Sequence, residues 1–565
     1  MSNFIEIAGI TFNYPDLIHE ERKTLDQIRL TIEMGEYIAI LGANGSGKST
    51  LAIMINALLL PDEGSVFISG LDTRQPENLA AVRRKIGMVF QSPEEQIFSS
   101  TIEEDVAFGL ENFGWEYEKM HARVKEILTK MDLWEVRLRP SYLLSGGQTQ
   151  RLALAGVLAI QPECIIFDEA TSMLDPMGRR VVLQQMRQLN EQGKTILHIT
   201  HSMDEALEAG RVVVLQKGSV VFDGNPRDLF SGEYELEAWN LTYPADRKLL
   251  RELKNALPNF PRETQSLDEA AEWFVSQNIL PPLPDRKSRK SDETEIAVQQ
   301  LRHVYLEGTP YQSRALLDVN LNISAGNSHG LIGVTGSGKS TLLQHLNGLL
   351  RPQEGSVVVG TYDLADRKLS RQELVQYVGL VMQNPEVQFF EEYVGDEIAY
   401  GPRTVEIKEP LAERVKWAME RVGLDFSAFK DRKVNTLSGG EKRKAALASI
   451  FALKPHVLLL DEPTAGLDPV AHGQIIQVFK QMQEQGTTMV VSSHNMQDIY
   501  TLCSEVTVLD RGRSIETGNT DDVLSNQARL DGMQLVPPSR LKLFQLYQQK
   551  IANATIHTEG EEAYE

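Results

Sequence analysis

Two features that many proteins of this size contain are missing here: a long hydrophobic stretch and a cluster of cysteines. The longest apolar run with a helical pattern, residues 51–60, includes Asn56 and falls short of the roughly 20 apolar residues that cross a bilayer. The first ten residues lack the basic and apolar regions of a signal peptide, so we expect none. The two cysteines, Cys164 and Cys503, are too far apart in sequence to suggest a disulfide framework or a metal cluster. We expect Cys164 to be buried, which fits a reducing compartment.

Positive charge is also scarce. The chain has 57 Lys and Arg against 78 Asp and Glu, a formal net charge of −21. Nucleic-acid-binding surfaces gather Lys and Arg, so we expect no nucleic-acid partner. The hydrophobic content of 42% is ordinary for a globular protein. A chain of 565 residues exceeds what one hydrophobic core usually holds, which indicates several domains.

One set of motifs is present twice. The pattern G-x-x-x-x-G-K-S occurs at residues 42–49 (GANGSGKS) and again at residues 333–340 (GVTGSGKS). The two lysines of this pattern are 291 residues apart, and the motifs that follow repeat in the same order at offsets of 292 and 293. A repeat at so constant a spacing indicates a tandem duplication.

Each half has the pattern of an α/β protein. A short apolar strand, residues 37–41, leads into the first glycine loop, and a helical pattern follows it. The apolar runs at residues 164–167 and 457–460 both end in acids, which is typical of buried parallel strands that present carboxylates at their carboxyl ends. The sequence therefore predicts two tandem P-loop NTPase cassettes with helical C-terminal extensions.

The join between the halves is marked by a Pro-rich, charged stretch that predicts an extended linker. The acidic C-terminal end predicts a disordered tail. The predicted divisions are a first cassette (1–229), a helical extension (230–280), a linker (281–294), a second cassette (295–529), a shorter helical extension (530–553) and an acidic tail (554–565).

The glycine loops predict ATP as the ligand. Glycines allow backbone N–H groups to converge on phosphates at the start of a helix. Lys48 and Lys339 are expected to reach the β- and γ-phosphates, and Ser49 and Ser340 to ligate Mg²⁺. A tight turn with an incidental lysine is the plain alternative, and two full matches disfavour it. The predicted nucleotide contacts of the loops are Gly42, Asn44, Gly45, Gly47, Lys48, Ser49, Thr50, Gly333, Thr335, Gly336, Gly338, Lys339, Ser340 and Thr341.

An Asp-Glu pair ends an apolar strand in each half. Asp168 and Asp461 suit the Mg²⁺ shell, and Glu169 and Glu462 suit the polarisation of an attacking water. Such a pair alone is usually a capping or loop acid. Its position after the glycine loop in both halves favours catalysis with ATP and Mg²⁺, and no covalent cofactor is expected.

LSGGQ (residues 144–148) and LSGGE (residues 437–441) resemble the signature of the ATP-binding cassette (ABC) ATPases. Alone, each serine would be an ordinary helix N-cap. The resemblance implies that the cassettes pair as a pseudo-dimer, in which each signature completes the site of the opposite cassette. Ser438 and Gly440 would then serve the ATP held by Lys48, and Ser145 and Gly147 the ATP held by Lys339. Pairing within one chain and between two chains are both compatible with the linker.

Further residues match motifs of the same family. Gln91 and Gln383 resemble its Q-loop, which contacts Mg²⁺ and senses the membrane partner. His201 and His494 resemble its switch histidine, which touches the γ-phosphate, although a lone histidine is more often a packed core residue.

Two more pairs of residues complete the resemblance. Tyr14 and Tyr305 would stack on adenine, and an apolar anchor on an edge strand is a serious alternative for them. Asp175 and Asp468 fit the family's D-loop at the cassette interface.

The stretches QSPEEQIF (residues 91–98) and QNPEVQFF (residues 383–390) narrow the resemblance. With FDEATSMLDP in the first half and LDEPTAGLDP in the second, they resemble the ATPase pair of energy-coupling-factor (ECF) transporters, here fused. This implies an ATPase at the cytoplasmic face of the membrane that energises import of a vitamin or transition-metal ion. Its partners would be a membrane-embedded coupling protein and a substrate-capture membrane subunit.

Two alternatives come from other classes of protein. Soluble twin-cassette ABC proteins that act on ribosomes also join two cassettes in one chain, but the acidic charge and the QxPExQ stretches disfavour that reading. A chromosome-structuring or DNA-repair ATPase would need long heptad helices between its motifs, and the sequence has none.

The two signatures differ in one charge. Glu441 stands in the second where Gln148 stands in the first, and Lys444 stands where the first has Arg151. A carboxylate close to a γ-phosphate is mildly repulsive, although it favours the helix dipole. The sequence therefore predicts that the site built on Lys48 is the slower of the two.

Overall fold

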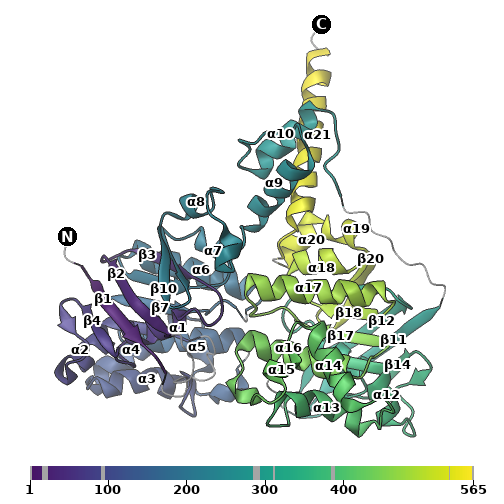
Figure 1. Cartoon of the computed structure of the whole chain (residues 1–565), viewed down its shortest axis with the longest axis horizontal. Coiled ribbons are helices and arrows are strands. Elements are labelled where there is room, and N and C mark those ends of the chain that lie inside the picture. The colour runs from purple at the N-terminus through teal and green to yellow at the C-terminus, as the bar shows by residue number, and fades with distance from the viewer. Residues whose placement is uncertain are drawn as a thin grey trace. The chain divides into compact units, whose positions relative to one another are not determined.

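The computed structural model describes residues 3–14, 23–90, 96–144, 146–172, 174–283, 293–309, 312–383, 388–533 and 535–562. The chain forms two compact units, Met1–Pro244 and Ala245–Glu565 (Figure 1). Gln91 and Ser145, both predicted site residues, lie outside the described residues, as does most of the predicted linker.

The first unit has a mainly parallel sheet beside an antiparallel one. The larger sheet has the strand order β10-β9-β3-β8-β7-β6, parallel except for β10 against β9. The smaller sheet, β2-β1-β4-β5, is antiparallel throughout. The strands are β1 (Ile5–Phe12), β2 (Leu25–Ile32), β3 (Tyr37–Leu41), β4 (Glu63–Ile68), β5 (Leu71–Asp72), β6 (Ile86–Val89), β7 (Cys164–Asp168), β8 (Thr195–Ile199), β9 (Arg211–Gln216) and β10 (Ser219–Gly224).

Both faces of the parallel sheet are covered. Along β3, Ala39 and Leu41 belong to one hydrophobic cluster while Ile38 and Ile40 belong to another, because successive side chains of a strand point to opposite faces. This is why the strands at the centre read as unbroken apolar runs. The helices of this unit are α1 (Lys48–Ile55), α2 (Leu79–Lys85), α3 (Ile102–Asn112), α4 (Tyr117–Lys130), α5 (Gly146–Ala159), α6 (Pro176–Glu191), α7 (Met203–Ala206) and α8 (Pro226–Leu229).

The second unit repeats this topology. Its strands β20-β19-β13-β18-β17-β16 follow the same order as β10-β9-β3-β8-β7-β6, and a single parallel pair between β12 and β20 joins them to β15-β14-β11-β12. The duplication seen in the sequence is thus a duplication of the fold. The strands are β11 (Thr294–Tyr305), β12 (Ser313–Ser324), β13 (Ser328–Ile332), β14 (Glu354–Val359), β15 (Tyr362–Asp363), β16 (Val378–Val381), β17 (Val457–Asp461), β18 (Thr488–Ser492), β19 (Glu505–Asp510) and β20 (Arg513–Asn519).

The helices of the second unit include two that precede its cassette in sequence. They are α9 (Ala245–Ala256), α10 (Leu267–Ser276), α11 (Lys339–Leu346), α12 (Arg371–Tyr377), α13 (Val394–Thr404), α14 (Leu411–Arg421), α15 (Phe426–Phe429), α16 (Gly439–Phe451), α17 (Pro469–Glu484), α18 (Met496–Leu502), α19 (Thr520–Leu524), α20 (Gln527–Gly532) and α21 (Ser539–Glu562). None of these described helices, nor any in the first unit, is long and apolar enough to cross a membrane.

The two predicted helical extensions meet in the second unit. α9 and α10 pack on α21 (Figure 1) through a cluster that includes Leu250, Phe274, Leu543 and Tyr547. Lys550 on α21 adds ion pairs to Asp268 and Glu272 on α10, at 3.1 and 2.8 Å. The predicted extension at residues 230–280 is therefore divided. Its first part packs in the core of the first unit, through Phe230, Leu236, Leu241 and Tyr243.

Two smaller expectations have different outcomes. Cys164 is buried as predicted, and so is Cys503. The disorder predicted for the last residues, 559–565, stays a prediction, while α21 continues to Glu562. Adding residues to an existing helix is far easier than nucleating a new one, so a polar composition does not by itself end a helix.

Candidate active sites

The glycine before each phosphate-loop helix has a left-handed backbone. Gly47 precedes α1 with φ 100°, and Gly338 precedes α11 with φ 107°. A Cβ atom on Gly47 would lie 2.6 Å from Leu25 and 2.7 Å from the Thr24 carbonyl oxygen, closer than real Cβ contacts. Gly338 meets Leu316 and Ala315 in the same way. Only glycine fits these positions, and it turns the loop so that the helix N-terminus faces the nucleotide position.

The loop lysines are held inside their own loops. Lys48 Nζ donates hydrogen bonds to the carbonyl oxygens of Gly42 (2.8 Å) and Ala43 (3.0 Å). Lys339 Nζ does the same to Gly333 (2.8 Å) and Val334 (3.1 Å). Both ammonium groups therefore lie inside their loops, and their contact with the β- and γ-phosphates stays a prediction.

The first unit brings two predicted Mg²⁺ ligands together. Ser49 Oγ donates to Asp168 Oδ1 at 3.2 Å, and Mg²⁺ prefers such oxygen ligands. Burial raises the pKa of Asp168 to about 6, and a bound cation would lower it again. Ser340 and Asp461 occupy the same places, at the start of α11 and the end of β17, while Gln383 is exposed two residues after β16. The donor set fits Mg²⁺.

In the first unit the predicted catalytic pair is in direct contact. Glu169 Oε1 lies 2.6 Å from His201 Nε2, and both side chains are about one-tenth exposed. The Glu169 backbone is left-handed at φ 49°, a conformation that a non-glycine residue adopts only when its surroundings impose it. Burial would raise the pKa of Glu169, but the contact with His201 and the charges of His201 and Lys48 together outweigh it, and the pKa is lowered.

The second unit has the same pair with a looser side-chain contact. Glu462 Oε1 lies 3.3 Å from His494 Nε2, and its Oε2 accepts a hydrogen bond from the His494 backbone at 3.2 Å. Glu462 is also left-handed, at φ 48°. Here burial dominates and raises the pKa of Glu462 well above its ordinary value.

The tyrosines of the predicted A-loops lie beside the phosphate-loop helices. The hydroxyl oxygen of Tyr14 is 3.4 Å from Thr50 Oγ1, and that of Tyr305 is 3.3 Å from Thr341 Oγ1. These polar contacts do not distinguish an apolar anchor from an adenine-stacking residue. Adenine stacking stays a prediction.

Comparison with known proteins identifies the family. Its sequence profile, described as "ABC transporter", matches residues 25–172 and 316–465. This chain belongs to the ABC transporter family. The two matched ranges confirm the predicted pair of cassettes.

Relatives match along nearly the whole chain. An ABC transporter ATP-binding protein of Caldanaerobacter subterraneus subsp. tengcongensis is 34% identical over 559 residues, 95% of each chain. One from Methanosarcina mazei is 33% identical over 560 residues, 95% of this chain and 93% of its own length. The energy-coupling factor transporter ATP-binding protein EcfA1 of Clostridium novyi is 45% identical over 268 residues, 47% of this chain and 96% of its own length. The resemblance to ECF ATPases that the motifs indicate is thus confirmed as a similarity.

The ABC signature of the second unit begins helix α16. Ser438 is its N-cap, and Glu441 Oε2 accepts hydrogen bonds from the backbone N–H of Ser438 (2.8 Å) and from its hydroxyl (2.9 Å). The sequence predicted a charge near the phosphate but missed that this carboxylate binds the signature serine itself. Gly440 lies in α16 and Gly147 in α5. The pairing of each signature with the opposite site stays a prediction.

The D-loop aspartates cap helices. Asp175 accepts from the Gly178 backbone at 2.7 Å at the start of α6, and Asp468 accepts from Val470 and Ala471 at the start of α17. Within each unit these aspartates act as ordinary helix N-caps. Their role at a cassette interface stays a prediction.

Sequence reasoning missed two buried carboxylates, Glu205 and Asp498. Both are under 5% exposed, and each contacts a threonine of its own catalytic loop. The signal was present, because an acid follows the switch histidine by four residues in both halves.

Proposed function

We propose that this chain is the ATP-hydrolysing subunit of an ECF-type importer for a vitamin or transition-metal ion. The observation that carries the proposal is the 45% identity to EcfA1 over 96% of that protein's length. A chain that contains two complete cassettes would supply both ATPases of such a system.

Each cassette would hold and hydrolyse its own ATP. Lys48 and Lys339 would bind the β- and γ-phosphates, and Glu169 and Glu462 would polarise the attacking water, oriented by His201 and His494. Mg²⁺ would neutralise charge that develops on the phosphates. The residues proposed to hold it are Ser49, Gln91 and Asp168 in the first cassette, and Ser340, Gln383 and Asp461 in the second.

The motif set supports a pseudo-dimer of cassettes. Each half carries both a phosphate loop and a signature, so that each can complete the site of the other. ATP bound between them would join the cassettes, and hydrolysis would release them. This cycle would power the membrane partner.

Exposed aromatic residues follow the Q-loop in both units. Phe98 and Phe390 are each 75% exposed. Phe98 lies beside Phe108, and Phe390 stacks on Tyr400. In the second unit a neighbouring groove of about 400 Å³ has a mixed lining, with Tyr393 and Phe426 together with Asp396, Arg403 and Lys430. Exposed apolar surface of this kind marks protein interaction sites. We propose that these two surfaces bind the membrane-embedded coupling protein, which would hold the chain at the cytoplasmic face.

Affinity purification from gently solubilised membranes tests this function. A polytopic membrane protein that co-purifies with a small membrane subunit is expected, and the double variant Phe98→Asp/Phe390→Asp should lose both. Tyr117→Asp changes an equally exposed aromatic on α4 and should retain them. Recovery with ribosomes and without a membrane partner would overturn the transport proposal and leave the ATPase assignment intact.

A further inference from the structure

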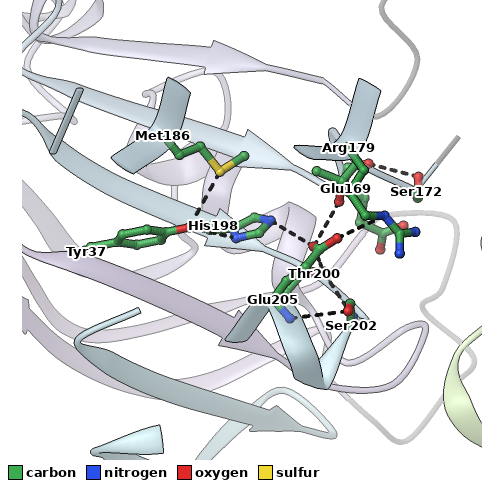
Figure 2. Close-up of polar contacts among 10 residues, drawn as sticks. Tyr37, Glu169, Ser172, Arg179, Met186, His198, Thr200, Ser202 and Glu205 are labelled. Carbon is green, nitrogen blue, oxygen red and sulfur yellow. Dashed lines mark hydrogen bonds and ion pairs between the residues drawn. The ribbon is translucent and has the colours of Figure 1, made fainter. Parts of the chain in front are cut away.

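A single buried carboxylate in the first unit binds both catalytic loops. Glu205 on α7 is 4% exposed. Its Oε2 accepts hydrogen bonds from the hydroxyls of Thr200 at 2.6 Å and Thr171 at 2.9 Å. Figure 2 shows Glu205 next to Thr200.

The two threonines belong to the segments that carry the catalytic pair. Thr171 follows Glu169 by two residues, and Thr200 directly precedes His201. Ser202 closes the connection on the other side of His201, because its backbone N–H donates to Thr200 Oγ1 at 3.0 Å and its hydroxyl accepts from the Glu205 backbone at 3.3 Å. Hydrogen bonds therefore connect the segment of the catalytic carboxylate and the segment of the switch histidine to the same side chain, Glu205.

The carboxylate is itself held by cationic and polar groups. Arg179 Nε on α6 lies 3.2 Å from Glu205 Oε1, and His198 Nε2 lies 3.3 Å from Oε2 (Figure 2). His198 Nδ1 is 3.3 Å from the Tyr37 hydroxyl. Burial would raise the pKa of Glu205, but His198, Arg179 and Thr200 outweigh it and lower the pKa to about 2. The Glu205 carboxylate is therefore ionised at neutral pH, and both of its oxygens can accept hydrogen bonds.

The second unit keeps the contact with the glutamate loop, through different residues. Asp498 on α18 is 3% exposed. It accepts from the Thr464 hydroxyl at 2.6 Å, and His472 Nε2 on α17 lies 2.8 Å from its other oxygen. Thr464 follows Glu462 by two residues, and His472 occupies the position of Arg179. The acid and its basic partner both changed while the contact with the glutamate loop remained, which a merely space-filling pair would not require.

We propose that Glu205 and Asp498 are positioning residues for ATP hydrolysis, each holding the loop of its own catalytic glutamate in register with the switch-histidine segment. The inference rests on the ATP hydrolysis proposed above and not on transport. A displacement of about 1 Å in a catalytic group can cost about a hundredfold in rate, so a hydrogen-bonded link at this place has a direct effect on turnover.

Single-site backgrounds test the proposal by turnover. Glu205→Gln should lower kcat about ten- to a hundredfold in the Glu462→Gln background, where only Glu169 acts, with the KM for ATP changed less than about threefold. In the Glu169→Gln background the loss should be at least about tenfold smaller. Asp498→Asn should show the reverse preference. Glu205→Asp, which installs the acid used by the second unit, should recover part of the rate.

A matched control separates positioning from stability. Asp223→Asn changes a carboxyl of the first unit, on β10, that accepts hydrogen bonds from the Arg211 guanidinium at 2.6 and 2.7 Å, away from the catalytic loops. It should leave turnover unchanged. Equal losses from Glu205→Gln in both backgrounds, or a loss that follows a raised KM alone, would overturn the proposal.

Amide hydrogen exchange gives a readout that needs no turnover. In the full chain, Glu205→Gln should speed exchange in residues 169–172 and 199–203, with residues 462–465 and 492–496 as the internal control. Thr171→Val, which removes only one hydroxyl from the link, should have the same effect to a smaller degree. Unchanged exchange in both variants would overturn the link. A wild-type chain without ATP turnover would instead contradict the proposed function.

Discussion

The two cassettes have the same backbone at the proposed catalytic glutamate and different surroundings for its carboxylate. Glu169 and Glu462 are both left-handed, at φ 49° and 48°. The closest approach of carboxylate oxygen and histidine nitrogen is 2.6 Å in the first cassette and 3.3 Å in the second. The histidine lowers the pKa of Glu169, while burial raises that of Glu462. Duplication has preserved the geometry and left the electrostatics free to diverge.

The cassettes also differ in the residue that binds the backbone of the loop after the proposed catalytic glutamate. Arg443 on α16 is 3% exposed and donates to the carbonyl oxygens of Glu462 (3.2 Å) and Ala465 (3.1 Å). Burial lowers its pKa to about 10. The first cassette has Gln150 at this position. The second loop is therefore fixed by a cation that the first does not have.

The largest expected effect comes from removing each catalytic carboxylate. Glu169→Gln and Glu462→Gln should each reduce turnover at their own site by about 10² to 10⁴, the usual contribution of general acid–base catalysis. At a pH above the acid limbs of both sites, the residual rates should be unequal, with Glu462→Gln, which leaves the Lys48 site, the slower variant. ATPase assays on the two single variants measure this. Equal residual rates would contradict the predicted asymmetry.

Loss of the buried guanidinium should come next. Arg443→Gln should destabilise the second unit by about 2 kcal/mol, because two carbonyl oxygens lose hydrogen bonds from a charged donor. Thermal unfolding should show a Tm lower by several degrees. Lys444→Ala removes a neighbouring cation with an exposed contact to Gln474 and should stay within about 0.5 kcal/mol. An unchanged Tm for Arg443→Gln would show that the two cassettes hold their loops equally well.

The pH dependence should distinguish the sites. A raised pKa keeps Glu462 protonated to higher pH, and the protonated form cannot polarise water. A lowered pKa keeps Glu169 ionised to lower pH. In kcat/KM, which reports the free protein, the acid limb of the Glu169→Gln variant should therefore lie at higher pH than that of Glu462→Gln. Coincident limbs, or the opposite order, would show that the two carboxylates titrate alike.

The signature exchange should have the smallest effect. Glu441→Gln removes the carboxylate that binds the Ser438 hydroxyl, and it should raise turnover of the Lys48 site a few-fold in the Glu462→Gln background. The reciprocal Gln148→Glu should lower turnover in the Glu169→Gln background. If neither variant changes the turnover, the charge of the signature does not cause the difference in rate between the two sites.

The sequence alone determined the architecture and the chemical groups. Two glycine loops, two strand-ending acid pairs and a constant offset predicted two α/β cassettes, since loop glycines, buried apolar strands and capping acids act over a few residues. The resemblance to the ABC family also predicted that Lys48, Glu169 and His201 share one site, which agrees with the common edge at which parallel strands of such a sheet end.

Only the tertiary structure decided which groups meet across long separations. Glu205 binds Thr171 across 34 residues, and α10 packs on α21 across more than 260. The pattern of an amphipathic helix predicts which face is buried but not which element covers that face. The position of an acid in the sequence likewise does not predict which groups donate hydrogen bonds to it. Those choices come from the packing of the whole chain, which no local pattern contains.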